Sequence, residues 1–122
     1  MAFNPVSPGT PSYGRIVKIT AIGNVAGPTQ AIDMFGGGVQ TITQTGTVAY
    51  SATNLSATES YTISVFITAS GADRTVTWDS NWKWTSTKPA TIVNGTTGML
   101  LLMNKGATAS DIVASWQVLG TG

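Results

Sequence analysis

Residues 61–78 read YTISVFITASGADRTVTW and carry the clearest strand pattern in the chain. Apolar and polar side chains alternate through residues 61–69, interrupted by Phe66, as expected for a strand with one buried face. The apolar members of this alternation are Tyr61, Ile63, Val65 and Ile67. Residues 71–73 form a predicted turn, after which residues 74–78 return as a second strand with Val76 and Trp78 on one face. This stretch indicates a β protein.

Strand-like segments also fill the rest of the chain, and no helical period extends beyond a turn or two. We predict these further strands at residues 15–22, 39–44, 47–50, 89–93, 99–103 and 112–119, and residues 31–35 form a short apolar piece. The segments 39–44 and 47–50, separated by Thr45 and Gly46, are predicted to pair as a hairpin. The triple glycine at 36–38 is typical of a sharp turn or a close backbone approach. Together these segments predict an all-β antiparallel β-sandwich, jelly-roll-like or barrel-shaped.

The first 14 residues differ in composition from the rest, because three prolines recur there at three-residue spacing. Proline lacks an N–H donor and has a restricted φ, so this stretch is predicted to be an extended arm, with a disordered tail as the alternative. With 122 residues, the chain has room for one core, and we assign residues 15–122 to a single β-sandwich domain. The arm residues expected to contact a partner are Phe3, Pro5, Pro8, Pro11 and Tyr13.

Composition excludes most enzyme classes. The chain contains neither cysteine nor histidine, so thiolate sites and the commonest general base and metal ligand are missing. Asp73 and Asp79 flank one strand in turn-like sequences, where aspartate commonly caps its own backbone. We therefore expect no catalytic residue, no cofactor and no metal site.

Charge is scarce as well, at 9% of residues with a net charge of +1. Without a basic cluster, nucleic-acid binding is not expected. The longest uninterrupted apolar run, residues 99–103, is too short for a spanning helix, and no charged segment precedes an apolar stretch at the N-terminus. We therefore expect neither a membrane span nor a signal peptide. A surface so poor in charge favours association, which indicates that much of it is covered by other subunits.

Four tryptophans invite a carbohydrate-binding interpretation, because flat aromatic rings stack on sugars. Trp78 and Trp116 lie in phase with the apolar faces of their strands and are predicted to fill the core. Trp82 and Trp84 flank Lys83 and are expected to point the same way, opposite to the lysine. For these two, a buried corner or a subunit contact is favoured over a ligand platform. Trp82 and Trp84 are thus also candidate partner-binding residues.

The stretch from Asn54 to Trp84 resembles a module that recurs in bacteriophage tail-fibre, tail and other virion proteins. The matching text is Asn54-Leu55, the strand at 61–69, Gly71, Arg74-Thr75-Val76-Thr77-Trp78 and Asn81-Trp82-Lys83-Trp84. The likeness extends over roughly residues 47–120, with segments 89–93, 99–103 and 112–119 in the places of the module's later strands. The usual aspartate is missing before 99–103, and residues 107–110 replace an Asp-Gly turn.

That resemblance implies β-sandwich units that form homotrimers without an enzymatic site. It favours a capsid decoration or cement protein of a bacteriophage virion, made in the host cytoplasm and bound to copies of itself and to the major capsid protein. The alternative is a tail-fibre or receptor-binding tip that contacts tail proteins and a host glycan. The chain lacks a repetitive shaft or long coiled coil, which favours cement. A secreted lectin-like module is a third interpretation, disfavoured because no signal peptide is expected.

Overall fold

The computed structural model describes residues 17–120, and more than half of these lie in β-strands. The strands are β1 (Ile19–Val25), β2 (Thr29–Asp33), β3 (Val39–Gln44), β4 (Val48–Thr53), β5 (Thr62–Ala69), β6 (Arg74–Trp78), β7 (Lys83–Trp84), β8 (Thr91–Ile92), β9 (Thr97–Asn104) and β10 (Ile112–Val118). Within this described part the only helical element is one 3-10 turn, Ala109–Asp111. The all-β prediction is therefore confirmed.

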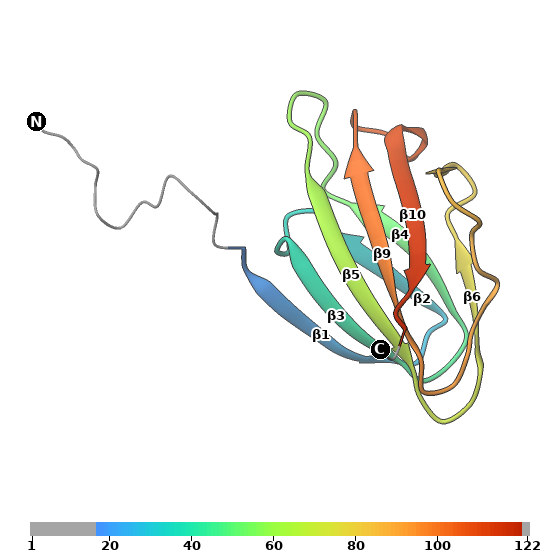
Figure 1. Ribbon diagram of the computed structural model, residues 1–122. Coiled ribbons are helices and arrows are strands. Elements are labelled where there is room, and N and C mark those ends of the chain that lie inside the picture. Colours follow the sequence, from blue (N-terminus) through green and yellow to red (C-terminus); the bar gives the residue numbers. More distant parts are fainter. Residues whose placement is uncertain (1–16, 121–122) are drawn as a thin grey trace, which may run out of the picture.

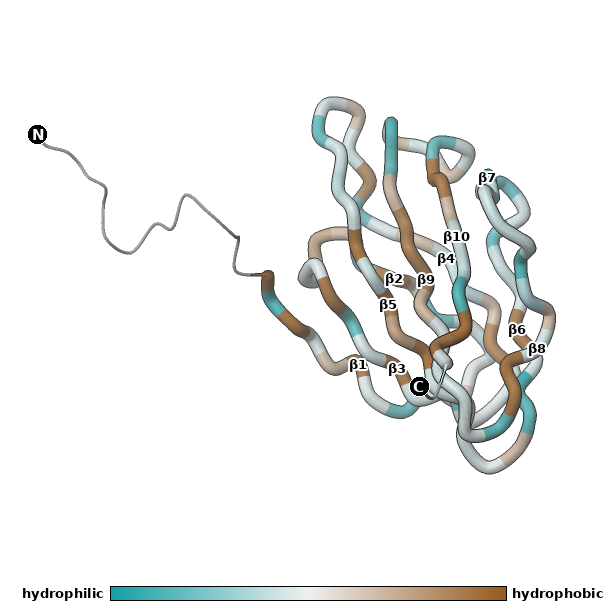
Figure 2. The backbone as a smooth tube through the Cα atoms, in the orientation of Figure 1, coloured by the Kyte–Doolittle hydropathy of each residue, from teal (hydrophilic) through white to brown (hydrophobic). Residues whose placement is uncertain are grey.

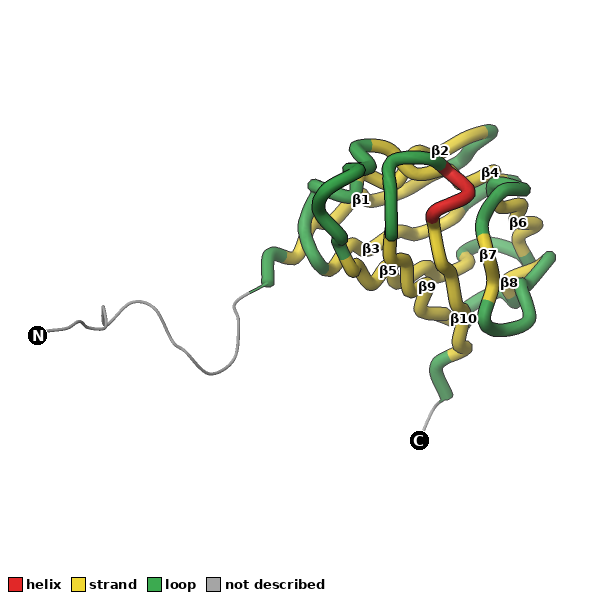
Figure 3. Tube along the Cα trace, turned by 90° about the horizontal axis from the view of Figure 1, so that it is seen from above, coloured by secondary structure: helices red, strands yellow, loops and turns green. Residues whose placement is uncertain are grey.

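The strands form two sheets that lie one over the other (Figures 1 and 3). The larger sheet has six strands in the order β1-β3-β5-β9-β10-β7, and the smaller has four in the order β2-β4-β6-β8. Apolar side chains from both sheets form one buried cluster, which includes Ile32 and Val48 from the smaller sheet and Val65 and Leu100 from the larger.

The pairing of the first six strands is parallel, so the antiparallel prediction is wrong for this half of the molecule. The chain alternates between the sheets: β1, β3 and β5 pair in parallel in the larger sheet, and β2, β4 and β6 pair in parallel in the smaller. The predicted hairpin of 39–44 with 47–50 is also wrong, because β3 and β4 belong to different sheets. The connection that contains Thr45 and Gly46 takes the chain from the larger sheet to the smaller one.

The connections between sheets stack closely because glycine leaves room for the backbone. A Cβ on Gly46 would lie 2.2 Å from the carbonyl oxygen of Ala26, and one on Gly27 would lie 2.0 Å from that of Thr47. The amide of Thr45 donates to the carbonyl of Val25 at 2.9 Å, which ties the connection between β3 and β4 to the connection between β1 and β2. The Gly27–Pro28 peptide bond in the first connection is cis.

The later strands of the larger sheet are antiparallel, as predicted. β9 pairs with β5 on one side and with β10 on the other. The short β7 extends the sheet by pairing in parallel with β10, and β8 pairs antiparallel with β6. A turn at Asn94 and Gly95 separates β8 from β9, and Gly95 has a φ of 81°.

Trp78 and Trp116 lie in the core, as predicted, and belong to an aromatic cluster. Tyr50 stacks on Trp78 with ring centroids 5.3 Å apart, and Trp116 lies 5.8 Å from Trp78 on another side. The Tyr50 hydroxyl donates to the buried Gln44 side chain at 3.0 Å. The amide of Gln44 donates in turn to the carbonyls of Gly46 and Thr75, so this buried polar chain is fully hydrogen bonded.

The observed bounds of the first strand differ from the predicted ones, 15–22. β1 begins at Ile19 and continues past the predicted end at residue 22 through Gly23 and Asn24. A register shift between Ala21 and Gly23 accommodates the extra residues. The predicted arm, residues 1–14, lies outside the described residues. The same holds for the candidate contact residues Phe3, Pro5, Pro8, Pro11 and Tyr13.

Candidate interaction surfaces

The face of the six-stranded sheet that points away from the core is uncharged and partly apolar. None of β1, β3, β5, β9 and β10 contains a charged residue. The inward positions of β3, β5 and β9, and those of β10 as far as Trp116, are buried, whereas β1 has one buried residue, Val25; the alternating outward positions remain partly accessible. We call the outward side chains of these five strands the outer face. Its apolar members are Ile19, Val39, Phe66, Met99, Leu101, Met103 and Val113.

Strand register brings these apolar side chains together in the middle of the sheet. Met99, Leu101 and Met103 occupy the outward positions of β9, the central strand of the antiparallel group, and Figure 2 shows this strand as one of the most apolar. Phe66 of β5 is paired with Met99, and Val113 of β10 with Met103. Met103 is 41% exposed, although methionine is usually buried. Depletion of charge and enrichment in methionine are features of protein interfaces.

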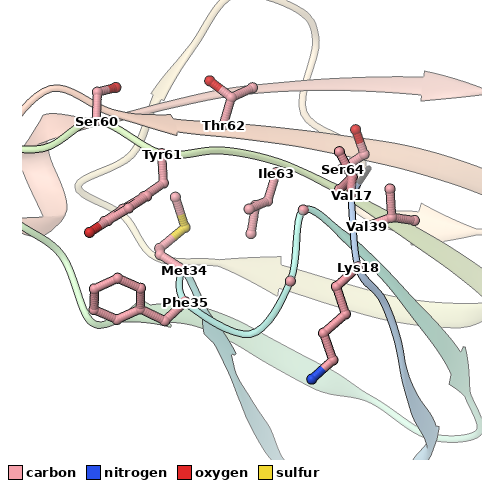
Figure 4. Close-up of a pocket in the computed structure, with 12 residues that line it drawn as sticks. Val17, Lys18, Met34, Phe35, Val39, Ser60, Tyr61, Thr62, Ile63 and Ser64 are labelled. Atoms are coloured by element: carbon pink, nitrogen blue, oxygen red, sulfur yellow. The ribbon is translucent and has the colours of Figure 1, made fainter. Parts of the chain in front are cut away.

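A second surface feature is a pocket of about 610 Å³ at one end of the outer face, which we call the Phe35 pocket. Figure 4 shows the Phe35 and Tyr61 rings at one end and Val17, Lys18 and Val39 at the other. The two ring centroids are 4.8 Å apart. Phe35 remains 64% exposed despite this contact. Lys18 is the one charged residue that lines the pocket within the described chain.

The turn that carries Phe35 is held in place by a buried side-chain amide. Gln40, which is buried in β3, donates to the carbonyls of Asp33 at 2.8 Å and of Gly37 at 3.2 Å. The carboxylate of Asp33 accepts the amide of Phe35 at 2.8 Å and the side chain of Asn54 at 2.7 Å. The turn at Phe35 is thereby anchored to two neighbouring elements.

The glycine triplet brings this turn against the start of β1, as its sequence predicts. A Cβ on Gly38 would lie 2.2 Å from the Val17 side chain, and one on Gly37, where φ is 117°, would lie 3.0 Å from the carbonyl oxygen of Lys18. The amide of Val39 donates to that same carbonyl at 3.2 Å. Val17 and Lys18 are consequently fixed at the wall of the pocket.

The Tyr61 side of the pocket is held by a second buried amide, that of Asn104. Its Oδ1 accepts the amide of Tyr61 at 2.6 Å, and its Nδ2 donates to the carbonyls of Ser56, Glu59 and Gly106, each at 3.1 Å. The Tyr61 hydroxyl donates to Glu59 at 2.7 Å, which raises the pKa of the tyrosine above its ordinary value. Both aromatic walls of the pocket are therefore positioned before any partner arrives.

Trp82 and Trp84 lie within the aromatic cluster and form no exposed platform. Trp82 is only 4% exposed, and Trp84 is half-buried against the core, with ring centroids 6.3 Å apart. Both rings also contact Trp78, while Lys83 is exposed, as the alternation predicts. Their indole N–H groups are buried without an acceptor among residues 17–120. Within the described chain Trp82 therefore lies in a buried corner, and the candidate role of Trp82 and Trp84 in binding a partner stays a prediction.

The aspartates stabilise turns instead of facing one another. Asp33, Asp73, Asp79 and Asp111 each accept a backbone N–H, from Phe35, Asn94, Asn81 and Thr108 respectively. The hydrogen bonds from Thr108, followed by the nearby Lys105, lower the pKa of Asp111. Residues 17–120 contain no cluster of three or more acidic side chains that could hold a metal ion.

Comparison with known proteins does not identify a family. No family model, curated protein or solved structure matches this chain. Within residues 17–120, no helix has the length and apolar character needed to cross a membrane.

The Phe35 pocket was not predicted from the sequence, because its two rings lie 26 positions apart and meet only through the strand arrangement. The glycine triplet was the one local signal that backbone segments approach closely there. The sequence predicted a surface poor in charge that other subunits cover, but not which face lacks charge. The uncharged strands of the outer face alternate along the chain with β2 and β6, which carry Asp33 and Arg74.

Proposed function

We propose that this chain is a non-enzymatic structural protein of a bacteriophage virion, a homotrimeric capsid decoration or cement subunit. The observation that carries the proposal is the outer face, five adjacent strands without one charged residue and with a central row of Met99, Leu101 and Met103. Such a face lowers the solubility of an isolated subunit and gains free energy when another subunit covers it.

The dimensions of the outer face suit a subunit interface. Five strands at a spacing of about 4.8 Å and seven residues at about 3.3 Å give a footprint of roughly 24 by 23 Å. This footprint of about 550 Å² is about two thirds of the roughly 800 Å² per partner that a standard-size protein interface buries, so the outer face can supply the larger part of one such interface. The resemblance to phage virion modules supports the proposal to the extent that it also implies an all-β subunit, and two packed sheets supply the rigid surface that a head-stabilising subunit needs.

A single substitution tests self-association. Leu101→Lys places a charge in the middle of the outer face, and we expect it to raise the dissociation constant of the trimer about 100-fold or more. Thr75 is an exposed residue of β6 in the other sheet, so Thr75→Lys is the matched control and should leave the trimer intact. Sedimentation equilibrium measures both against the 12.6 kDa chain mass. A wild-type chain that stays monomeric, or a Leu101→Lys variant that stays trimeric, would contradict the proposal.

Location on the particle needs a separate experiment. An antibody raised against the purified chain should label heads in electron micrographs of the phage that encodes it. Labelling of tails would replace the cement assignment by the tail-fibre alternative. Particles that carry no label at either position would refute a virion role altogether.

A further inference from the structure

We propose that the Phe35 pocket receives the N-terminal segment, residues 3–13, of a neighbouring copy of the same chain. This inference rests on the proposed function, since it requires copies that lie side by side. The pocket has the volume of known ligand sites, about 610 Å³, and its lining combines apolar and aromatic side chains with the hydroxyl groups of three Ser and Thr residues. The hydrogen bonds of Gln40 and Asn104 hold those walls in place, which limits the entropy lost when a peptide binds.

The chemistry of the N-terminal segment matches that of the pocket. Residues 1–14 contain no charged side chain, and the pocket has one, Lys18, at the end away from the rings. Pro5, Pro8 and Pro11 recur every three residues, which is the period of a polyproline II helix, so in that conformation they would share one face. Proline-rich segments of this kind dock onto aromatic grooves, and the Phe35–Tyr61 pair provides one.

The position where the described chain begins also points to this pocket. Val17 is the first described residue and forms part of the pocket wall, with its side chain against Gly38. The segment that precedes it therefore starts at the rim, at the end opposite Phe35 and Tyr61 (Figure 4). In the assembly proposed above, the same segment of an adjacent copy is available to fill the aromatic end.

Cysteine cross-linking tests the pairing cleanly, because the natural chain has no cysteine. Two full-length variants are co-expressed, Tyr13→Cys and a mass-tagged Thr62→Cys; Thr62 is exposed and lines the pocket. Mild oxidation should give a disulfide-linked dimer of the two different chains. Thr75→Cys, exposed on the other sheet, replaces Thr62→Cys in the matched control and should give little of this product.

Removal of the exposed ring tests the pocket itself. Adding Phe35→Ser to the tagged Thr62→Cys chain should lower the yield of mixed dimer roughly five-fold or more, as expected for loss of an aromatic anchor. Phe35 is mostly exposed, so the fold should survive, and circular dichroism checks this. An unchanged yield from a folded Phe35→Ser chain would overturn the assignment of the pocket.

The remaining outcomes separate this inference from the proposed function. Equal cross-linking at Thr62 and Thr75 would overturn it, as would a disulfide that forms only within one chain carrying both Tyr13→Cys and Thr62→Cys. Sedimentation of the same samples gives the oligomeric state. A trimer without the mixed cross-link refutes only the docking of the segment, whereas a monomer refutes the proposed function as well.

Discussion

Single residues explain how the two layers come together at the aromatic cluster. Trp116 lies directly over Gly98, where a Cβ would come within 1.8 Å of its ring. The ring fills the space that the glycine leaves and contacts Trp78 beside it. The large side chain of Trp116 on β10 thus packs where the neighbouring strand β9 has a glycine, Gly98, and no side chain.

Trp116→Ala should lower the free energy of unfolding by about 3–5 kcal/mol, the range for a large aromatic side chain removed from a core. The substitution leaves a cavity beside Trp78 that the rigid sheet cannot close. Chemical denaturation measures the change. A melting temperature within a degree of the parent would place Trp116 outside the stabilising core.

Tyr50 gives a prediction about pH. Burial raises the pKa of its phenol well above the ordinary value of 10.0. Because the folded-state pKa is the higher one, the stabilisation linked to the protonated phenol is complete below pH 10 and is lost as the pH rises above it. Tyrosine absorbance during an alkaline titration should show Tyr50 ionising only together with unfolding. Ionisation of every tyrosine near pH 10 in the folded protein would be inconsistent with this burial.

Elements of the first half are linked by stacked connections that cross between the sheets. Gly46→Ala should destabilise the protein by about 1–3 kcal/mol, as overpacking does, since the new methyl group meets the backbone of Ala26. Gly120→Ala is the control, because a Cβ there meets nothing within 4 Å, and its effect should stay within about 0.5 kcal/mol. Equal melting temperatures for the two variants would show that the connections do not pack as described.

The strands themselves were predictable, and their partners in the first half were not. A period of two identified β5 and its buried face, because alternation depends only on neighbours along the chain. Whether Thr45-Gly46 makes a hairpin or crosses to the other sheet depends on contacts with Ala26, about twenty residues away. For the site, charge scarcity predicted a covered surface without saying which face it is, and the Phe35 pocket depends on buried amides that sequence alone does not pair.

The whole molecule separates its charges from its largest face. Charged side chains occur in turns, in the smaller sheet and on β7, while the five longest neighbouring strands of the larger sheet have none. The interaction that we propose there is hydrophobic, and mobile ions screen charges without weakening apolar contacts.

Association of the subunits should therefore be nearly independent of salt. Between about 0.05 and about 0.5 M sodium chloride, we expect the dissociation constant of the trimer to change less than about two-fold, since no ion pair is screened. Sedimentation at several protein concentrations provides the measurement. Dissociation of the trimer on addition of salt would indicate an interface built on charges and located away from the outer face.

The parallel stacking of the early strands proceeds in circuits through both layers. Ile19 pairs with Val39, and Thr29 with Ala49, each twenty positions further on. The next circuit is longer, because Val39 pairs with Ser64 and Val48 with Val76, 25 and 28 positions further on. Each circuit still adds one strand to each sheet, and most of the extra residues lie in the connection 54–61 between β4 and β5. A connection of this kind can therefore change in length without changing which strands pair.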